Sequence, residues 1–91
     1  MRSEQMLEQL EAAAERVGVK LSYEALGGES SLPGALCRVR GQWRLIIDRG
    51  CQPSERVALI ARALGRFDVE GLFLSPEVRD IVERNQRLGT A

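Results

Sequence analysis

The side chains that most often carry protein chemistry are scarce in this chain of 91 residues. It has no histidine, and therefore lacks the side chain that most commonly binds metals or acts as a general base near neutral pH. The two cysteines, Cys37 and Cys51, match neither a C-x-x-C redox pair nor a zinc cluster. Cys51 stands near Arg49 and just before an expected helix, which would favour some thiolate character, but it has no histidine as a base. We expect plain thiols.

Carboxylates are the remaining groups that could act in catalysis. An enzyme would have to use Cys51 or carboxylates such as Glu24 and Glu29, which lie in a glycine- and serine-rich segment. Asp68 and Glu70 would share one side of a strand-like segment without an organised partner, which is typical of solvated charge. No phosphate loop, nucleotide fingerprint, calcium loop or serine-hydrolase elbow is present. We therefore expect no catalytic residues, no metal and no cofactor.

Arginines offer a different chemistry, the binding of acidic groups. Two of them stand one helical turn apart in Arg62-Ala63-Leu64-Gly65-Arg66. One interpretation is a solvated helix face neutralised by nearby acids such as Glu55. The other is a basic surface for an acidic partner, formed by Arg38, Arg40, Arg44, Arg62 and Arg66. Nucleic acid is an alternative ligand for such a surface, but Trp43 is the only aromatic residue near it, so base stacking has little support.

A row of glutamates marks the opposite charge near the N-terminus. It consists of Glu4, Glu8, Glu11 and Glu15. Glu4 and Glu8, like Glu11 and Glu15, are one helical turn apart, and each such like-charge pair costs roughly a few tenths of a kcal/mol in an isolated helix. The stripe is either a solvated face or the counterpart of an arginine surface on this chain, a second copy or another protein. An interface of that kind would weaken with salt.

Length and composition indicate one small globular domain over residues 1–91. The formal net charge is zero, but residues 31–66 carry seven basic and two acidic side chains, whereas both flanking regions are acidic. No apolar run is long enough to cross a membrane, and the glutamates among the first 17 residues argue against a signal peptide. We expect a cytoplasmic protein.

Periodicity predicts the elements that would position these groups. Apolar residues at three- and four-residue spacing indicate a helix over 3–17, which Gly18 would end, and a short strand over 19–23 follows. A central helix begins at Pro53 or Ser54 and runs to about Phe67. A final helix begins at Ser75 and Pro76, the segment 72–74 packs back onto the core, and the tail 85–91 is expected to fray.

Two further strands, near 35–40 and 43–48, are expected to form a hairpin. A two-residue loop at Gly41-Gln42 would mix apolar and charged side chains on both faces, so a three-residue loop is favoured, pairing Cys37 with Leu45. That register places Arg38 and Arg44 together on the opposite face. The elements in the order α-β-β-β-α-α predict an α+β domain with a three-stranded antiparallel sheet.

This order of elements resembles the core of the ImmA/IrrE-type metallopeptidases. The resemblance covers roughly residues 5–67 and rests on the hairpin ending in Leu45-Ile46-Ile47-Asp48, the Pro-Ser-Glu-Arg helix start and the segment 59–66. In that family a similar helix carries H-E-x-x-H, in which two histidines bind zinc and a glutamate activates water. Arg62, Ala63 and Arg66 occupy the matching positions. Two cations cannot bind a third and alanine cannot accept a proton, so the family's activity does not carry over.

The sequence thus predicts a non-catalytic domain. Its expected role is a small intracellular protein-interaction or regulatory module, on a degenerate metallopeptidase-like scaffold, with a protein partner or a second copy of itself. Binding of nucleic acid through an arginine-rich hairpin and helix face is the alternative.

Overall fold

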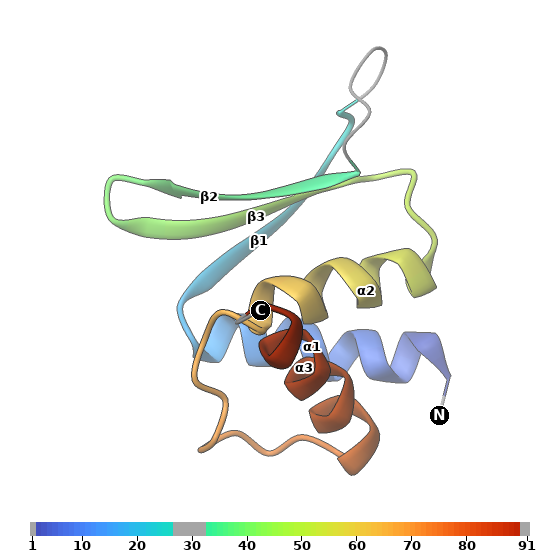
Figure 1. Cartoon of the computed structure of the whole chain (residues 1–91). Helices are drawn as coiled ribbons and strands as arrows, with labels where there is room; N and C mark the ends of the chain where they lie inside the picture. The colour runs from blue at the N-terminus through green and yellow to red at the C-terminus, as the bar shows by residue number, and fades with distance from the viewer. Residues whose placement is uncertain (1, 27–32, 90–91) are drawn as a thin grey trace.

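The computed structural model describes residues 2–26 and 33–89, and shows helices that cover one face of a small sheet (Figure 1). The fold is α+β, with the elements in the expected order. These elements are α1 (Ser3–Arg16), β1 (Val19–Glu24), β2 (Gly34–Val39), β3 (Gln42–Asp48), α2 (Pro53–Leu64) and α3 (Pro76–Gly89). The helices of the described residues all lie on the same side of the sheet, so within these residues its other face carries no helix.

The sheet is mixed, and the expectation of a purely antiparallel sheet was wrong in this respect. The strand order is β1-β3-β2, with β2 antiparallel and β1 parallel to β3. The chain leaves β1, forms the far edge with β2 and returns through the hairpin to the centre. This path gives the central place to β3, whose Leu45 and Ile47 are buried against the helices.

The hairpin turns through Arg40 and Gly41, so the expected register was also wrong. Val39 pairs with Gln42, and Leu36 instead of Cys37 lies opposite Leu45. Arg40 and Gly41 have φ values of 52° and 81°. Positive φ at both positions is the geometry of a tight two-residue turn whose twist matches that of the strands. Arginine is an uncommon residue there, which is why this loop was not expected.

Helix α1 ends as the sequence predicts, at a glycine in the left-handed region. Gly18 has a φ of 89° and leads directly into β1. Helix α2 begins at Pro53 with Gln52 as its N-terminal cap. The backbone N–H of Gln52 donates to the Glu55 carboxylate at 2.9 Å, which fixes the start of the helix.

Helix α3 extends further than expected. Ser75 Oγ accepts a hydrogen bond from the Val78 N–H at 3.4 Å, as a cap at the predicted start. The helix continues to Gly89, past residue 85 where the tail was expected to begin, and residues 90 and 91 lie outside the described part of the chain. Gln86 Nε2 donates to the Phe67 carbonyl at 3.0 Å and ties this last part of α3 to the end of the α2 region.

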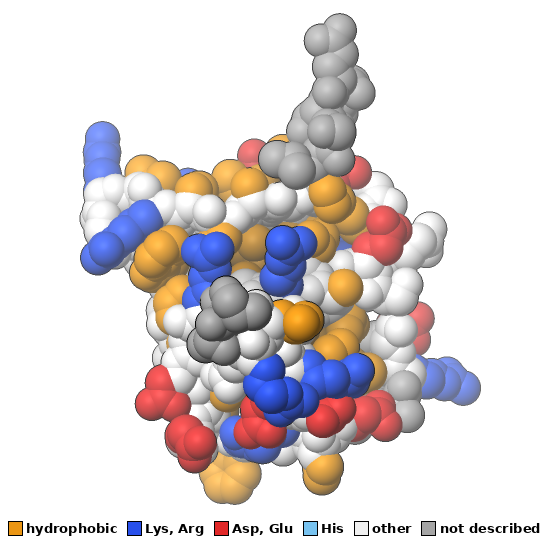
Figure 2. Space-filling view, in the orientation of Figure 1, with side chains coloured by type: hydrophobic (Ala, Val, Ile, Leu, Met, Phe, Trp, Pro, Cys, Tyr) orange, Lys and Arg blue, Asp and Glu red, His pale blue; other side chains and the backbone are white. Residues whose placement is uncertain are grey.

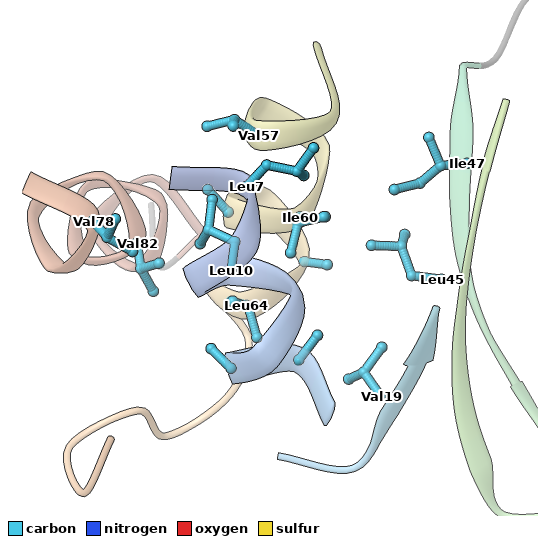
Figure 3. Packing of buried hydrophobic residues seen from close by; sticks show 14 of the residues in the cluster. Leu7, Leu10, Val19, Leu45, Ile47, Val57, Ile60, Leu64, Val78 and Val82 are labelled. Carbon is cyan, nitrogen blue, oxygen red and sulfur yellow. The ribbon is translucent and has the colours of Figure 1, made fainter. Parts of the chain in front are cut away.

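The core forms where the three helices meet one another and the inner face of the sheet (Figure 3). Leu10 of α1, Ile60 of α2 and Val78 of α3 are fully buried. Leu45 and Ile47 point from β3 toward the helices in Figure 3. Burial of such side chains stabilises a domain by about 1.5–3 kcal/mol each relative to exposure. Among the described residues, no helix is long and apolar enough to cross a membrane.

The connection between α2 and α3 packs on the core at only two of the three expected positions. Leu72 and Leu74 are partly buried against the cluster, whereas the side chain of Phe73 is 100% exposed. The guanidinium of Arg79 holds this connection in place by donating to the carbonyls of Val69 at 3.3 Å and Leu72 at 2.5 Å.

Candidate interaction surface

Helix α2 presents Arg62 and Arg66 to solvent from its C-terminal end. The helix is anchored by its buried side, which includes Ile60, Ala61 and Leu64. Burial of these residues turns Arg62 outward, and Arg66, one turn later and just beyond the helix end, is exposed as well. Positive charge is favourable near the C-terminal end of a helix because it complements the helix dipole.

The two arginines border a groove between α2 and the edge strand β2. The groove has a volume of about 270 Å³. Its lining combines apolar side chains with the two arginines, and consists of Gly34, Ala35, Leu36, Leu45, Leu59, Arg62, Ala63 and Arg66. We call this feature the arginine groove. Figure 2 shows Lys and Arg side chains beside exposed hydrophobic atoms where α2 lies beneath the sheet.

Within the described residues, neither Arg62 nor Arg66 has an ion pair or a hydrogen bond from its guanidinium. Glu55, the acid that could have neutralised them, is instead bonded to the backbone at the start of α2. The arginine groove therefore carries a positive charge that the described part of the chain does not neutralise.

Arg38 lies on the same face of the sheet as the arginine groove. Its guanidinium stands 5.6 Å from the centroid of the Trp43 ring, the cross-strand partner of Arg38. Trp43 in turn meets Phe67 edge to face, with ring centroids 5.8 Å apart. Because Phe67 directly follows Arg66, this series of ring contacts places Arg38 at the end of the groove where Arg66 lies.

The other two arginines of the candidate surface lie elsewhere. Arg40 is in the hairpin turn, and Arg44 points to the sheet face that carries no helix, where both border a hollow with Lys20. The expectation that Arg38 and Arg44 share a face fails because the hairpin register differs by one residue. The nucleic-acid alternative required all five arginines on one surface. The structure does not bring them together there.

The acidic stripe follows α1 but is not uniform. Glu4, Glu8 and Glu15 are exposed, whereas Glu11 is partly buried and accepts a short hydrogen bond from the Tyr23 hydroxyl. Burial raises the pKa of Tyr23 above its ordinary value, and the bond to Glu11 raises it further. None of the ion pairs within the described chain joins this stripe to the arginine groove.

The two cysteines are both free thiols, in different surroundings. Cys51 is buried, and its Sγ faces the Pro33 carbonyl at 3.8 Å. Burial raises the pKa of the Cys51 thiol, with nearby Glu55 and Asp48 acting in the same direction and Arg56 against them. This shift is opposite to the thiolate character considered from sequence. Cys37 is partly exposed on the sheet face without helices.

The carboxylates considered for catalysis have local structural partners where they are described. Glu24 accepts a hydrogen bond from Ser22 Oγ at 2.9 Å, and Asp68 accepts one from the Glu70 N–H at 3.0 Å. Glu29 lies outside the described residues. The described residues contain no group of three or more Cys, Asp or Glu side chains placed to hold a metal ion. Ala63 is buried at the groove.

Sequence reasoning missed the apolar part of the arginine groove. The signal was present in α2, where Leu59 and Ala63 extend the apolar surface beyond the side that faces the core. Leu36 was expected on the other sheet face because the hairpin register was misjudged. Comparison with protein families, with characterised proteins and with solved structures finds no match to this chain.

Proposed function

We propose that the chain is a non-catalytic protein-interaction module whose arginine groove binds an acidic segment of a partner protein. The observation that carries the proposal is the pairing of an apolar groove with Arg62 and Arg66, which have no acidic partner among the described residues. The proposal places the protein in the cytoplasm, where Cys37 and Cys51 would stay reduced.

The chemistry of the groove supports this class of partner. A guanidinium presents a planar set of donors that matches a carboxylate, so two arginines one turn apart favour a segment with spaced Asp or Glu side chains. The apolar lining from Leu36, Leu45 and Leu59 suits aliphatic side chains between those acids. The partner would therefore present acids and aliphatic residues together in a short segment.

The proposal also covers the origin of the scaffold. We infer that it derives from a metallopeptidase-like core in which Arg62, Ala63 and Arg66 replaced the two histidines and the glutamate of H-E-x-x-H. Support comes from their position, since all three border one groove between a central helix and an edge strand. In this account a former catalytic cleft has become a binding groove.

Selection from a library of random linear peptides displayed on phage tests the proposed ligand class. The proteins compared are the wild type, the groove variant Arg62→Glu/Arg66→Glu, and the control Arg16→Glu/Arg84→Glu, which changes the net charge equally at exposed positions outside the arginine groove. Wild type and control should enrich peptides that combine Asp or Glu with aliphatic residues.

Individual enriched peptides should bind the groove variant roughly tenfold or more weakly, because a hydrogen bond to a charged group contributes about 1.5–3 kcal/mol. Enrichment of peptides without acids, or equal binding to all three proteins, would remove the arginine groove as the binding site.

A further inference from the structure

The sheet face without helices has a charge pattern that is complementary to itself. Leu45 and Ile47 point toward the helices, so their neighbours in β3 point the other way, together with the residues paired with them in β1 and β2. We call this surface the outer sheet face. It consists of Lys20, Ser22, Glu24, Ala35, Cys37, Val39, Gln42, Arg44, Ile46 and Asp48.

Strand pairing arranges the outer sheet face in rows, with Val39 and Gln42 next to the hairpin turn and three rows beyond them. The first row is basic, because Lys20 lies beside Arg44, and Cys37 completes it. The middle row has Ile46 at its centre, between Ser22 and Ala35. The last row is acidic, because Glu24 lies beside Asp48. An apolar centre is thus bounded by opposite charges at the two ends of the strands.

The apolar part of this face is accessible. Val39 is 45% exposed, and Ile46, although it is in the central strand, is only partly buried. The helices all lie on the other side of the sheet (Figure 1). No helix of the described residues covers the apolar side chains on this face.

We propose that the outer sheet face binds a second copy of this chain through a twofold axis that runs across the strands. Such an axis reverses the strands, and places Lys20 and Arg44 of one copy over Glu24 and Asp48 of the other. Ile46 then meets Ile46 of the second copy near the axis. An axis along the strands would instead place basic row over basic row and acidic row over acidic row. The charges therefore select one symmetric, self-complementary arrangement.

The small size of the face sets the strength of the contact. Strand spacings give the outer sheet face dimensions of about 14 by 17 Å. The area within these dimensions is far below the roughly 800 Å² that each partner buries in a standard interface. The dimer is therefore transient and salt-sensitive, and its measurement needs protein concentrations from about 10 µM to 1 mM. The inference does not depend on the arginine groove, which lies between α2 and β2 and shares only Ala35 with the outer sheet face.

A charge-exchange series followed by analytical ultracentrifugation at low salt tests the proposed geometry. Lys20→Glu and Glu24→Lys should each weaken dimerisation by roughly tenfold or more, because each places like charges opposite one another twice in the dimer. The double variant Lys20→Glu/Glu24→Lys should restore dimerisation to near the wild-type level. Circular dichroism verifies that each variant is folded.

Two controls separate this contact from other association. Glu8→Lys makes the same charge change outside the outer sheet face and should leave dimerisation unchanged, as should the groove variant Arg62→Glu/Arg66→Glu. A wild-type protein that stays monomeric to about 1 mM would overturn the proposal. So would failure of the double variant to restore association, or an equal loss in Glu8→Lys.

Discussion

Among single residues, Arg62 in α2 and Arg66 just beyond its end show best how local structure creates a candidate site. Arg62 and Arg66 face outward because Ile60, Ala61 and Leu64 face the core. Among the described residues their charge has no acidic partner, and Glu55 is bonded to the backbone at the other end of the helix. Function at this site therefore depends on how the helix distributes its acidic and basic groups.

Tyr23 and Cys51 predict a pH dependence of stability. The pKa of each is raised in the folded protein, which means that the unfolded chain loses these protons first as the pH rises. The free energy of unfolding should be unaffected by these groups below about pH 8.5, and should fall above about pH 8.5 for the thiol and about pH 10 for the phenol.

Urea unfolding at pH 7, 9 and 10.5 measures this effect in the wild type and in the double variant Tyr23→Phe/Cys51→Ala. The variant should lose less stability between pH 7 and pH 10.5, whatever its stability at pH 7. Parallel pH profiles of the two proteins would contradict the surroundings assigned to these side chains.

Among the elements, the crossing of α2 and α3 depends on Gly65. A Cβ atom built there would lie 2.9 Å from Asn85 Cβ and 3.0 Å from the Asn85 carbonyl carbon. The φ of Gly65 is −59°, which alanine adopts without strain. The only obstacle to alanine at this position is therefore the close contact with α3. Gly65→Ala should destabilise the protein by about 1–3 kcal/mol, as overpacking does in cores.

Gly71→Ala is the matched control, because a Cβ at Gly71 meets no atom within 4 Å. Its free energy of unfolding should stay within about 0.5 kcal/mol of the wild type. Thermal or urea unfolding of both variants gives the comparison. If Gly65→Ala were as stable as Gly71→Ala, α3 would not pass as closely to α2 as the structure indicates.

The elements also show how far the sequence predicts the fold. Helix and strand positions follow from periodicity and from glycine, proline and serine at helix ends, as at Gly18 and Ser75. Alternation says which strand residues are apolar but not which strand is the neighbour, so the parallel pairing of β1 with β3 was missed. The hairpin register was missed because Arg40 takes a left-handed conformation that favours other residues.

The sequence predicts only part of the candidate site. The spacing of Arg62 and Arg66 on one helix indicates that they share a face, and the structure places them on one groove. Arg38 and Arg44 lie on different faces because of the strand register, which sequence patterns hardly determine. A groove between a helix and an edge strand depends on packing distances, which no local pattern contains.

In the whole molecule, glutamates and arginines border hollows at opposite edges of the sheet. Glu11 and Glu15 border a hollow beside β1, at one edge of the sheet, and Arg62 and Arg66 border the arginine groove beside β2, at the other. The net charge of zero is therefore the sum of acidic and basic groups that lie on different surfaces. An acidic partner should be attracted to one edge only, and its binding should weaken as salt rises.

The most direct test of this account is capture of partners from a lysate of the protein's own cells with three baits, after nuclease treatment. The baits are the wild type, Arg62→Glu/Arg66→Glu and the control Arg16→Glu/Arg84→Glu. If the arginine groove binds a partner protein, wild type and control should retain at least one protein that the groove variant loses and that salt releases. The same captured proteins on all three baits, or capture that nuclease abolishes, would contradict a protein-binding arginine groove.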